Sequence, residues 1–420
     1  MVRSFCLRRP LALAVAVVAT LVIVTGGSPP ARAEEAGAIA SRALAAGTIN
    51  AGIGEIEAVL KAKPDDADAQ AALGVLRFVG AIERFAQAMY RHGFEPGGHD
   101  YGPLLRMPLP VNPNPEKLDY ATFRQIFATL SSDLDAAGKT LAEVGDRPVK
   151  LRLTPGTWRI DIDGDGKGTE GEALLLLAAG EQIPPDMMAQ AEGFTVAFDT
   201  ADIYWLRGYS NLLGVFADFW LAHDFQETFD ATFQVLFPRA GLPNAAALDT
   251  GAMIEGMNAG QIADTIALLH MIRWPIAEPA RYEAIRQRLL QVIALNRLTW
   301  KAAKAETDDD REWLPSPTQK NGVVPNVSIT DERLTGWFGA LGEAEDVLEG
   351  RKMLPHWRFA KGIDVKKLAA EPRSFDLVLW ATGHAALPYL ADGPVADGSA
   401  WAQANRLFDG NLMAYAFWFN

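Results

Sequence analysis

Apolar residues recur every three or four positions along most of this 420-residue chain, and this spacing constrains its fold more than any other feature. The clearest run follows Asp119 and passes through Phe123, Ile126, Leu130, Leu134, Ala137 and Leu141. A repeat of this period places one face of an α-helix in a core. Further helices are expected at 172–180, about 199–236, 245–271, 277–304, 331–350 and 400–418, and Asp199 is a suitable N-cap for the second of these. The sequence therefore predicts a mainly α fold, a helical array or bundle.

Three stretches break this pattern. The segment 93–115 carries five prolines between Pro103 and Pro115, which rule out regular structure there. The segment 304–330, with Asp308, Asp309 and Asp310 and prolines from Pro315 onward, predicts a long exposed loop and a boundary. Between them, apolar and polar residues alternate from Val149 to Thr154, which indicates a short strand.

The first 33 residues have the features of a targeting segment. Arg3, Arg8 and Arg9 precede an apolar run from Leu11 to Val24, and small residues close the segment at 31–33. A membrane anchor is the alternative, but the run is shorter than the ~20 residues that a spanning helix needs. The only cysteine, Cys6, lies before the run and not at its end, which disfavours a lipid anchor. We expect a cleaved signal peptide at 1–33 and a periplasmic or secreted protein.

The net charge of the chain limits the classes of molecule that it can bind. The formal net charge is −13, and removal of residues 1–33 takes four arginines and no acidic residue, so the exported chain is more acidic still. Such a surface repels nucleic acid and anionic lipid. No later apolar run is long enough to span a membrane. We therefore expect no nucleic-acid partner and no membrane contact after cleavage.

The first unit after the signal peptide, 34–92, is rich in alanine and has a break at Pro64. Gly74, Ala86 and Tyr90 have the offsets of the small and aromatic positions of a tetratricopeptide repeat, and the stretch of about 49–92 resembles a degenerate repeat pair of this kind. The resemblance covers about one and a half repeats, with no third copy. An ordinary helical hairpin explains the pattern equally well.

One motif carries specific chemistry. Residues 161–172 read DIDGDGKGTEGE, with carboxylates at loop positions one, three, five and twelve and glycine at six. This resembles an EF-hand calcium loop, which supplies hard oxygen ligands from alternate residues. The resemblance implies one Ca²⁺ site, and its ligands would come from Asp161, Asp163, Asp165, the Lys167 carbonyl, Thr169 and Glu172.

Two departures from that family bear on the role of the loop. Position eight, usually a branched apolar residue that pairs with a second loop, is Gly168, and the chain has no second loop. Pro155 and Gly156 exclude a long entering helix. A sensor needs two helices that swing apart on binding, so a structural Ca²⁺ site is favoured over a regulatory one.

These features divide the chain into 1–33, the helical hairpin at 34–92, a calcium-loop segment at 93–180 and a helical domain at 181–420. Two functions remain open. The first is a non-enzymatic scaffold that binds another protein of the cell envelope. The second is an exported polysaccharide hydrolase with calcium as a structural clamp, which would need tryptophans such as Trp205, Trp220 or Trp380 beside two carboxylates in one cleft. The sequence identifies no catalytic residue and no organic cofactor. The histidines lack the spacing of a zinc site.

Overall fold

A computed structural model of the chain describes residues 31–96, 105, 107–179, 185–244, 266–320, 322–323 and 328–420. The predicted signal peptide and most of the expected helix 245–271 lie outside these residues. Within them the protein is mainly α-helical, as the apolar spacing predicts. No helix in this part of the chain is long and apolar enough to cross a membrane.

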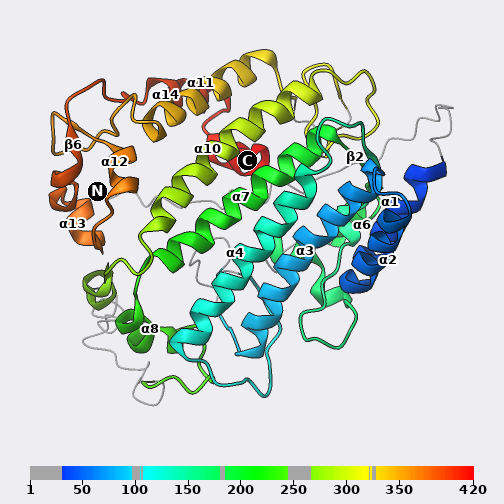
Figure 1. Cartoon of the computed structure of the whole chain (residues 1–420), viewed down its shortest axis with the longest axis horizontal. Helices are drawn as coiled ribbons and strands as arrows, with labels where there is room; N and C mark the ends of the chain where they lie inside the picture. Colours follow the sequence, from blue (N-terminus) through cyan, green and yellow to red (C-terminus); the bar gives the residue numbers. More distant parts are fainter. Residues whose placement is uncertain are drawn as a thin grey trace.

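Four long helices lie side by side as one layer, each antiparallel to the next (Figure 1). They are α3 (Ala67–Arg91), α4 (Tyr120–Ala142), α7 (Thr200–Ala222) and α10 (Ala280–Ala303). Three begin at an aspartate whose side chain accepts a hydrogen bond from the first turn, namely Asp66, Asp119 and Asp199. The predicted cap at Asp199 is thereby confirmed. Each cap satisfies backbone N–H groups that have no partner within the helix.

Shorter elements extend and cover this layer. Near α3 lie α1 (Ala31–Ala46) and α2 (Ile49–Ala62), and beyond α10 lie α11 (Asp331–Leu348) and α14 (Ser399–Leu407) (Figure 1). Other short helices among the described residues are α5 (Leu174–Ala179), α6 (Pro185–Glu192), α8 (Gln226–Thr232), α12 (Val365–Ala370), α13 (Leu377–Ala381) and α15 (Leu412–Phe419).

The strands are few and paired in twos. The strand predicted near 149–154 is β1 (Lys150–Leu153), which pairs antiparallel with β2 (Val196–Asp199). The other antiparallel pairs are β3 (Arg273–Trp274) with β5 (Phe375–Asp376), and β4 (Gly362–Ile363) with β6 (Leu390–Ala391). Register in the first pair runs from Lys150 opposite Asp199 to Leu153 opposite Val196. This pairing holds the start of α7 next to the stretch that enters the acidic loop.

One hydrophobic core runs through the described residues from α1 to α15. Its centre is aromatic: Phe123 of α4 packs against Trp220 of α7 and against Phe225, Phe229 and Phe233. A second, small cluster forms around Ile363, Ala386 and Tyr389. Aromatic pairs of this kind add to the stabilisation that burial alone supplies.

Two sequence-based expectations change. The segment 304–330 is not simply an exposed loop, because Glu312, Leu314 and Ser316 are buried. The residues that carry the tetratricopeptide resemblance, Gly74, Ala86 and Tyr90, all lie on the single helix α3. Gly74 approaches Leu141 of α4 and not a facing repeat helix. The family relation itself stays a prediction.

Candidate calcium site

The acidic loop 161–172 lies between β1 and α5 and is closed by extended chain on both sides. The Ile160 amide donates to the Glu172 carbonyl (3.1 Å), and the Leu174 amide donates to the Trp158 carbonyl (2.8 Å). Arg159 and Ala173 form an antiparallel bridge between these flanks. A 3₁₀ turn at Pro155–Thr157 precedes these flanks, and no long helix enters the loop.

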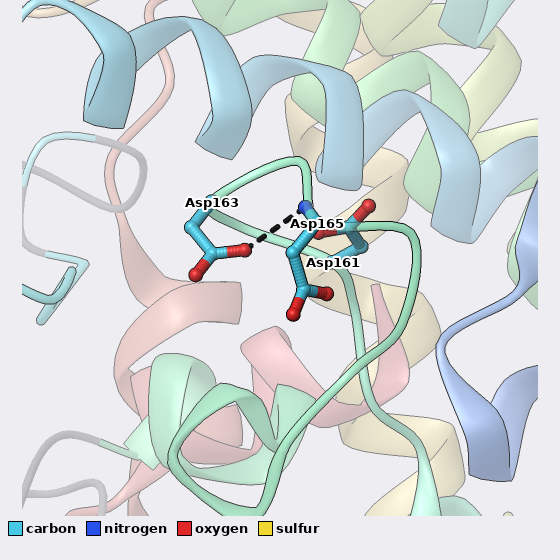
Figure 2. A group of neighbouring side chains, drawn as sticks. All are labelled: Asp161, Asp163 and Asp165. Carbon is cyan, nitrogen blue, oxygen red and sulfur yellow. Dashed lines mark hydrogen bonds between the residues drawn. The ribbon is translucent and has the colours of Figure 1, made fainter.

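Three predicted ligands come together in this loop. Carboxylate oxygens of Asp161, Asp163 and Asp165 lie within 4.8 Å of one another. Figure 2 shows the three side chains along the tip of the loop. Oxygens that bind one calcium ion at roughly 2.4 Å can lie up to about 4.8 Å apart. The three aspartates therefore have a spacing that a single hard cation can bridge.

Hydrogen bonds within the loop hold it curled. The Asp161 carboxylate accepts from the amides of Gly164 (2.8 Å) and Gly166 (3.0 Å). Asp163 accepts from the Asp165 amide (3.1 Å), the bond drawn in Figure 2. Gly164 and Gly166 have φ of +80° and +95°, a region that a side chain with a Cβ tolerates poorly. The positive φ expected at Gly166 is confirmed.

Glu172, the predicted bidentate ligand, lies apart from this group. Its Oε1 accepts from the amides of Ile162 and Asp163 (2.8 and 3.3 Å), and its Oε2 accepts from the amide and hydroxyl of Thr169 (2.8 and 2.7 Å). Burial raises the pKa of the Glu172 carboxyl, but these four hydrogen bonds outweigh it and the pKa lies below its usual value. Glu172 clamps the two ends of the loop. Bidentate coordination would require it to exchange some of these donors for the ion.

The other two predicted ligands contribute less directly. Lys167 is exposed, and its ammonium lies 4.0 Å from Asp165. The Thr169 hydroxyl is used by Glu172. The structure therefore gathers three of the six predicted ligands through their side chains.

Gly168 explains the first departure from the EF-hand pattern. Its amide donates to the Ala46 carbonyl at the end of α1 (2.9 Å). A Cβ at this position would lie 2.6 Å from the Arg159 Cβ and 3.1 Å from the Gly47 Cα. The loop thus pairs with the turn between α1 and α2 where an EF-hand loop pairs with a second loop. Sequence reasoning missed this turn, because its residues lie more than a hundred positions earlier.

Helix α3 holds the opposite side of the loop. Glu83 accepts from the Asp161 amide (2.9 Å), and Gln87 donates to the Asp161 carbonyl (2.6 Å). Burial, together with the charges of Asp161 and Glu172, raises the pKa of Glu83 to about 7 against the lowering effect of the Asp161 amide. The only feature of the sequence that could have indicated this role of Glu83 is its place as an acidic residue on the buried face of a helix.

A second group of carboxyl groups was not predicted. Asp199 and Asp202, at the start of α7, meet Glu306 and Glu312 from the segment after α10. Oxygens of Asp199, Glu306 and Glu312 lie within 4.8 Å of one another. Asp202 is 3 % exposed and Glu312 is 4 % exposed. Asp199 and Glu306 are half-buried.

Among the described residues, the three tryptophans named for a hydrolase lie apart from one another. Trp205 packs on Trp313, Trp220 lies in the aromatic core against Phe123, and Trp380 stacks on Tyr389 in the small second cluster. Asp199 and Asp224 flank the two ends of the 23-residue helix α7, about 35 Å apart. That exceeds the ~9.5 Å over which two carboxyl groups cooperate in glycoside hydrolysis.

Histidine 223 is a satisfied core residue. It is 0 % exposed, and its ring nitrogens lie 2.7 Å from the Phe219 carbonyl and 2.7 Å from the Tyr282 hydroxyl. Among the described residues, every group of side chains that could hold a metal ion consists of carboxylates alone.

No family of known proteins, no curated protein and no solved structure matches this chain. The interpretation therefore depends on the loop and its neighbours.

Proposed function

We propose that this is an exported helical protein in which the loop 161–172 binds one Ca²⁺ and fixes the junction of α1, α2 and α3 with the β1–β2 pair. The observation that carries the proposal is the cluster of Asp161, Asp163 and Asp165 on a loop already curled by its own amides. Two contacts of the loop support it: Gly168 is hydrogen-bonded to the end of α1, and Asp161 is hydrogen-bonded to Glu83 of α3. An ion bound there would connect elements that are distant in sequence.

The role we propose for the ion is structural. The loop is flanked by extended chain and fixed at both faces, so no pair of helices is free to swing apart as in a sensor. Single extracellular loops of this type bind calcium at about 10⁻⁴ to 10⁻³ M. At a free concentration of 100 times the Kd, binding would stabilise the fold by about 2.7 kcal/mol. Calcium in the medium would thus determine how firmly the N-terminal helices are held.

We further propose that the helical layer serves as a non-enzymatic scaffold for another protein of the cell envelope. Separated tryptophans and buried carboxyl groups favour this over the hydrolase alternative. Hydrolysis of bacterial or plant polysaccharide by the purified protein would reverse this preference. Sequencing the N-terminus of the protein recovered from the periplasm or medium tests cleavage after Ala33.

The deciding experiment is calorimetric titration of Ca²⁺ into the chelated protein, with thermal unfolding at the same concentrations. Asp163 and Asp165 are exposed, so Asp163→Asn and Asp165→Asn remove charge without disturbing the core. We expect one saturable site with a raised Tm, and at least tenfold weaker binding in each variant. Asp392→Asn, at an exposed aspartate that pairs with Lys361, is the matched control and should bind like the native chain. Absence of binding at millimolar Ca²⁺ would refute the proposal.

A further inference from the structure

The segment 304–320, between α10 and α11, is folded back onto the β1–β2 pair and the start of α7. The Ala197 amide of β2 donates to the Arg311 carbonyl (3.2 Å). Trp313 packs against Phe198 of β2 and Trp205 of α7, with ring centroids 6.1 and 5.1 Å away. We call residues 304–320 the return segment. Its contacts combine apolar packing with an unusual polar centre.

That centre consists of four carboxyl groups. Asp199 and Asp202 come from the β2–α7 junction, and Glu306 and Glu312 come from the return segment. Carboxyl oxygens of Asp199, Glu306 and Glu312 lie within 4.8 Å of one another. Two ionised carboxylates at this distance repel each other, whereas a proton held by one of them allows a hydrogen bond to its neighbour.

The surrounding cations do not neutralise this centre. Lys150 of β1 pairs with Asp308 and with Asp310 (2.9 Å), and Arg152 lies 3.7 Å from Asp310. The Arg311 guanidinium lies over the Phe194 ring (5.5 Å). Lys304 pairs with Asp331 on α11 (2.7 Å).

Among the described residues no lysine or arginine forms an ion pair with any of the four inner carboxyl groups. The only neutral side chain of the return segment that donates a hydrogen bond to one of these four groups is Gln319, whose amide donates to Glu306 (2.9 Å). The outer acids Asp308 and Asp310 raise the pKa of Glu312 further.

We propose that the return segment is a proton-dependent latch: protons held among Asp199, Asp202, Glu306 and Glu312 keep it closed on α7, and their loss to solvent releases it. Burial of uncompensated like charges is unfavourable, and protonation is the means by which such groups avoid it. Once Glu306 ionises, its carboxylate repels Asp199 and Glu312, whose oxygens lie within 4.8 Å. The return segment is the side of the contact that can move away.

The pKa shifts agree in direction. Burial, followed by the bond to Asp199, raises the pKa of Glu306 to about 9, and burial with the charge of Asp199 raises that of Glu312 to about 8. Burial, then the charge of Asp199, raises the pKa of Asp202 well above its usual value. Raised carboxyl pKa values contribute stability that is complete below the unfolded value of ~4.3 and is lost as pH rises through the folded values. The latch is therefore expected to open between about pH 8 and 9.

The test is hydrogen exchange, read by mass spectrometry as protection factors corrected for intrinsic exchange, at pH 6, 7.5 and 9.5 in the presence of a chelator. We expect protection of peptides from 304–320 to fall at least tenfold between pH 6 and 9.5. Glu306→Gln cannot ionise and carries an amide that can donate to Asp199, so its protection should change less than threefold. Glu332→Gln, at an exposed glutamate of α11, is the control and should behave like the native chain.

Two results would overturn the latch. One is native protection that does not change with pH, and the other is the same loss in Glu306→Gln as in the native chain. Should Glu306→Gln fail to fold, infrared difference spectra of the native protein decide instead. A protonated-carboxyl band present at pH 7 and lost by pH 10 supports the latch, and its absence at pH 7 refutes it.

Discussion

Single residues determine how the acidic loop is seated. Gly168 and Gly171 lie three positions apart in the loop, but their surroundings differ. A Cβ at Gly168 would meet the Arg159 Cβ at 2.6 Å and backbone atoms of Gly47, whereas one at Gly171 would meet only the Thr169 hydroxyl at 4.0 Å. Backbone atoms cannot move aside as the end of a flexible side chain can. The close approach to the α1–α2 turn therefore depends on Gly168.

Gly168→Ala should destabilise the protein by about 1–3 kcal/mol, the usual cost of an overpacked site. The measurement is the free energy of unfolding in urea, with chelator and with saturating Ca²⁺. Gly171→Ala is the matched control and should stay within about 0.5 kcal/mol of the native value. Equal effects from the two substitutions would contradict the proposed seating of the loop.

His223 leads to a pH prediction on the acid side. Its Nδ1 donates to the Phe219 carbonyl, so its Nε2 accepts from the Tyr282 hydroxyl. Burial lowers the pKa of His223, and the nearby Arg124 lowers it further, against the effect of the Phe219 carbonyl. A lowered histidine pKa contributes stability that is complete above the unfolded value of ~6.5 and is lost as pH falls through the folded value.

The expected result is that native stability declines below about pH 6.5. His223→Gln retains two hydrogen-bonding atoms without a titrating group, so its stability should be lower at pH 7 but should fall less between pH 7 and 5. His384→Gln, at an exposed histidine, provides the comparison. Parallel pH profiles for the native chain and His223→Gln would show that His223 is not the group responsible.

At the scale of elements, the close packing of α3 on α4 depends on a small residue. A Cβ on Gly74 of α3 would lie 2.3 Å from Cδ2 of Leu141 on α4 and 3.4 Å from its Cα. Gly54 of α2 is also helical but has nothing within 4 Å of its Cβ position. The same substitution at the two sites therefore separates packing from helix propensity.

We expect Gly74→Ala to lower the free energy of unfolding by about 1–3 kcal/mol, because α3 and α4 must separate or Leu141 must leave its preferred rotamer. Gly54→Ala should raise it by about 0.5–1 kcal/mol, since alanine is the better helix former at an unhindered site. Chemical denaturation measures both. Stabilisation by Gly74→Ala would mean that the two helices are farther apart than described here.

Local patterns predicted much at this scale. The long helices follow from one-sided apolar spacing and from caps such as Asp119, and the cluster of aspartates in the acidic loop follows from a motif confined to twelve residues. The partners of these elements were not predictable. Strand β2 lies far from β1 in sequence, and the loop is anchored by Gly47 and Glu83, which carry no local signal of that role.

The return segment shows why the expectation of a fully exposed loop was only partly right. Three consecutive aspartates from Asp308 and prolines from Pro315 have the composition of a solvated loop, which led to the expectation of exposure. Packing of the half-buried Trp313 against Phe198 and Trp205, and burial of Leu314 beside it, override this composition. Composition indicates the free-energy cost of burying carboxylates, but it does not indicate the apolar packing that brings Glu312 into the interior.

For the whole molecule, the C-terminal helix α15 links elements from both halves of the chain, and Figure 1 shows the chain end at the middle of the helical layer. Phe419 is fully buried against Trp300 of α10 and Trp337 of α11, with ring centroids 4.8 and 5.5 Å away. Its carbonyl accepts from Asn296 (2.7 Å). The aromatic tail 415–419 therefore docks on the core.

Truncation of Phe419 should therefore affect the stability of the entire fold and not only that of the tail. Phe419→Ala removes a ring that fills the space between α10 and α11, and loss of a buried phenylalanine costs about 3–5 kcal/mol. Phe417, on the same helix, is 49 % exposed, so Phe417→Ala keeps the helix but should cost under about 1 kcal/mol. The measurement is thermal unfolding followed by far-UV and near-UV circular dichroism. A single transition shifted to lower temperature in Phe419→Ala is expected, because the core is continuous from α1 to α15. Two separated transitions would show that the helical layer unfolds independently of its C-terminal cover.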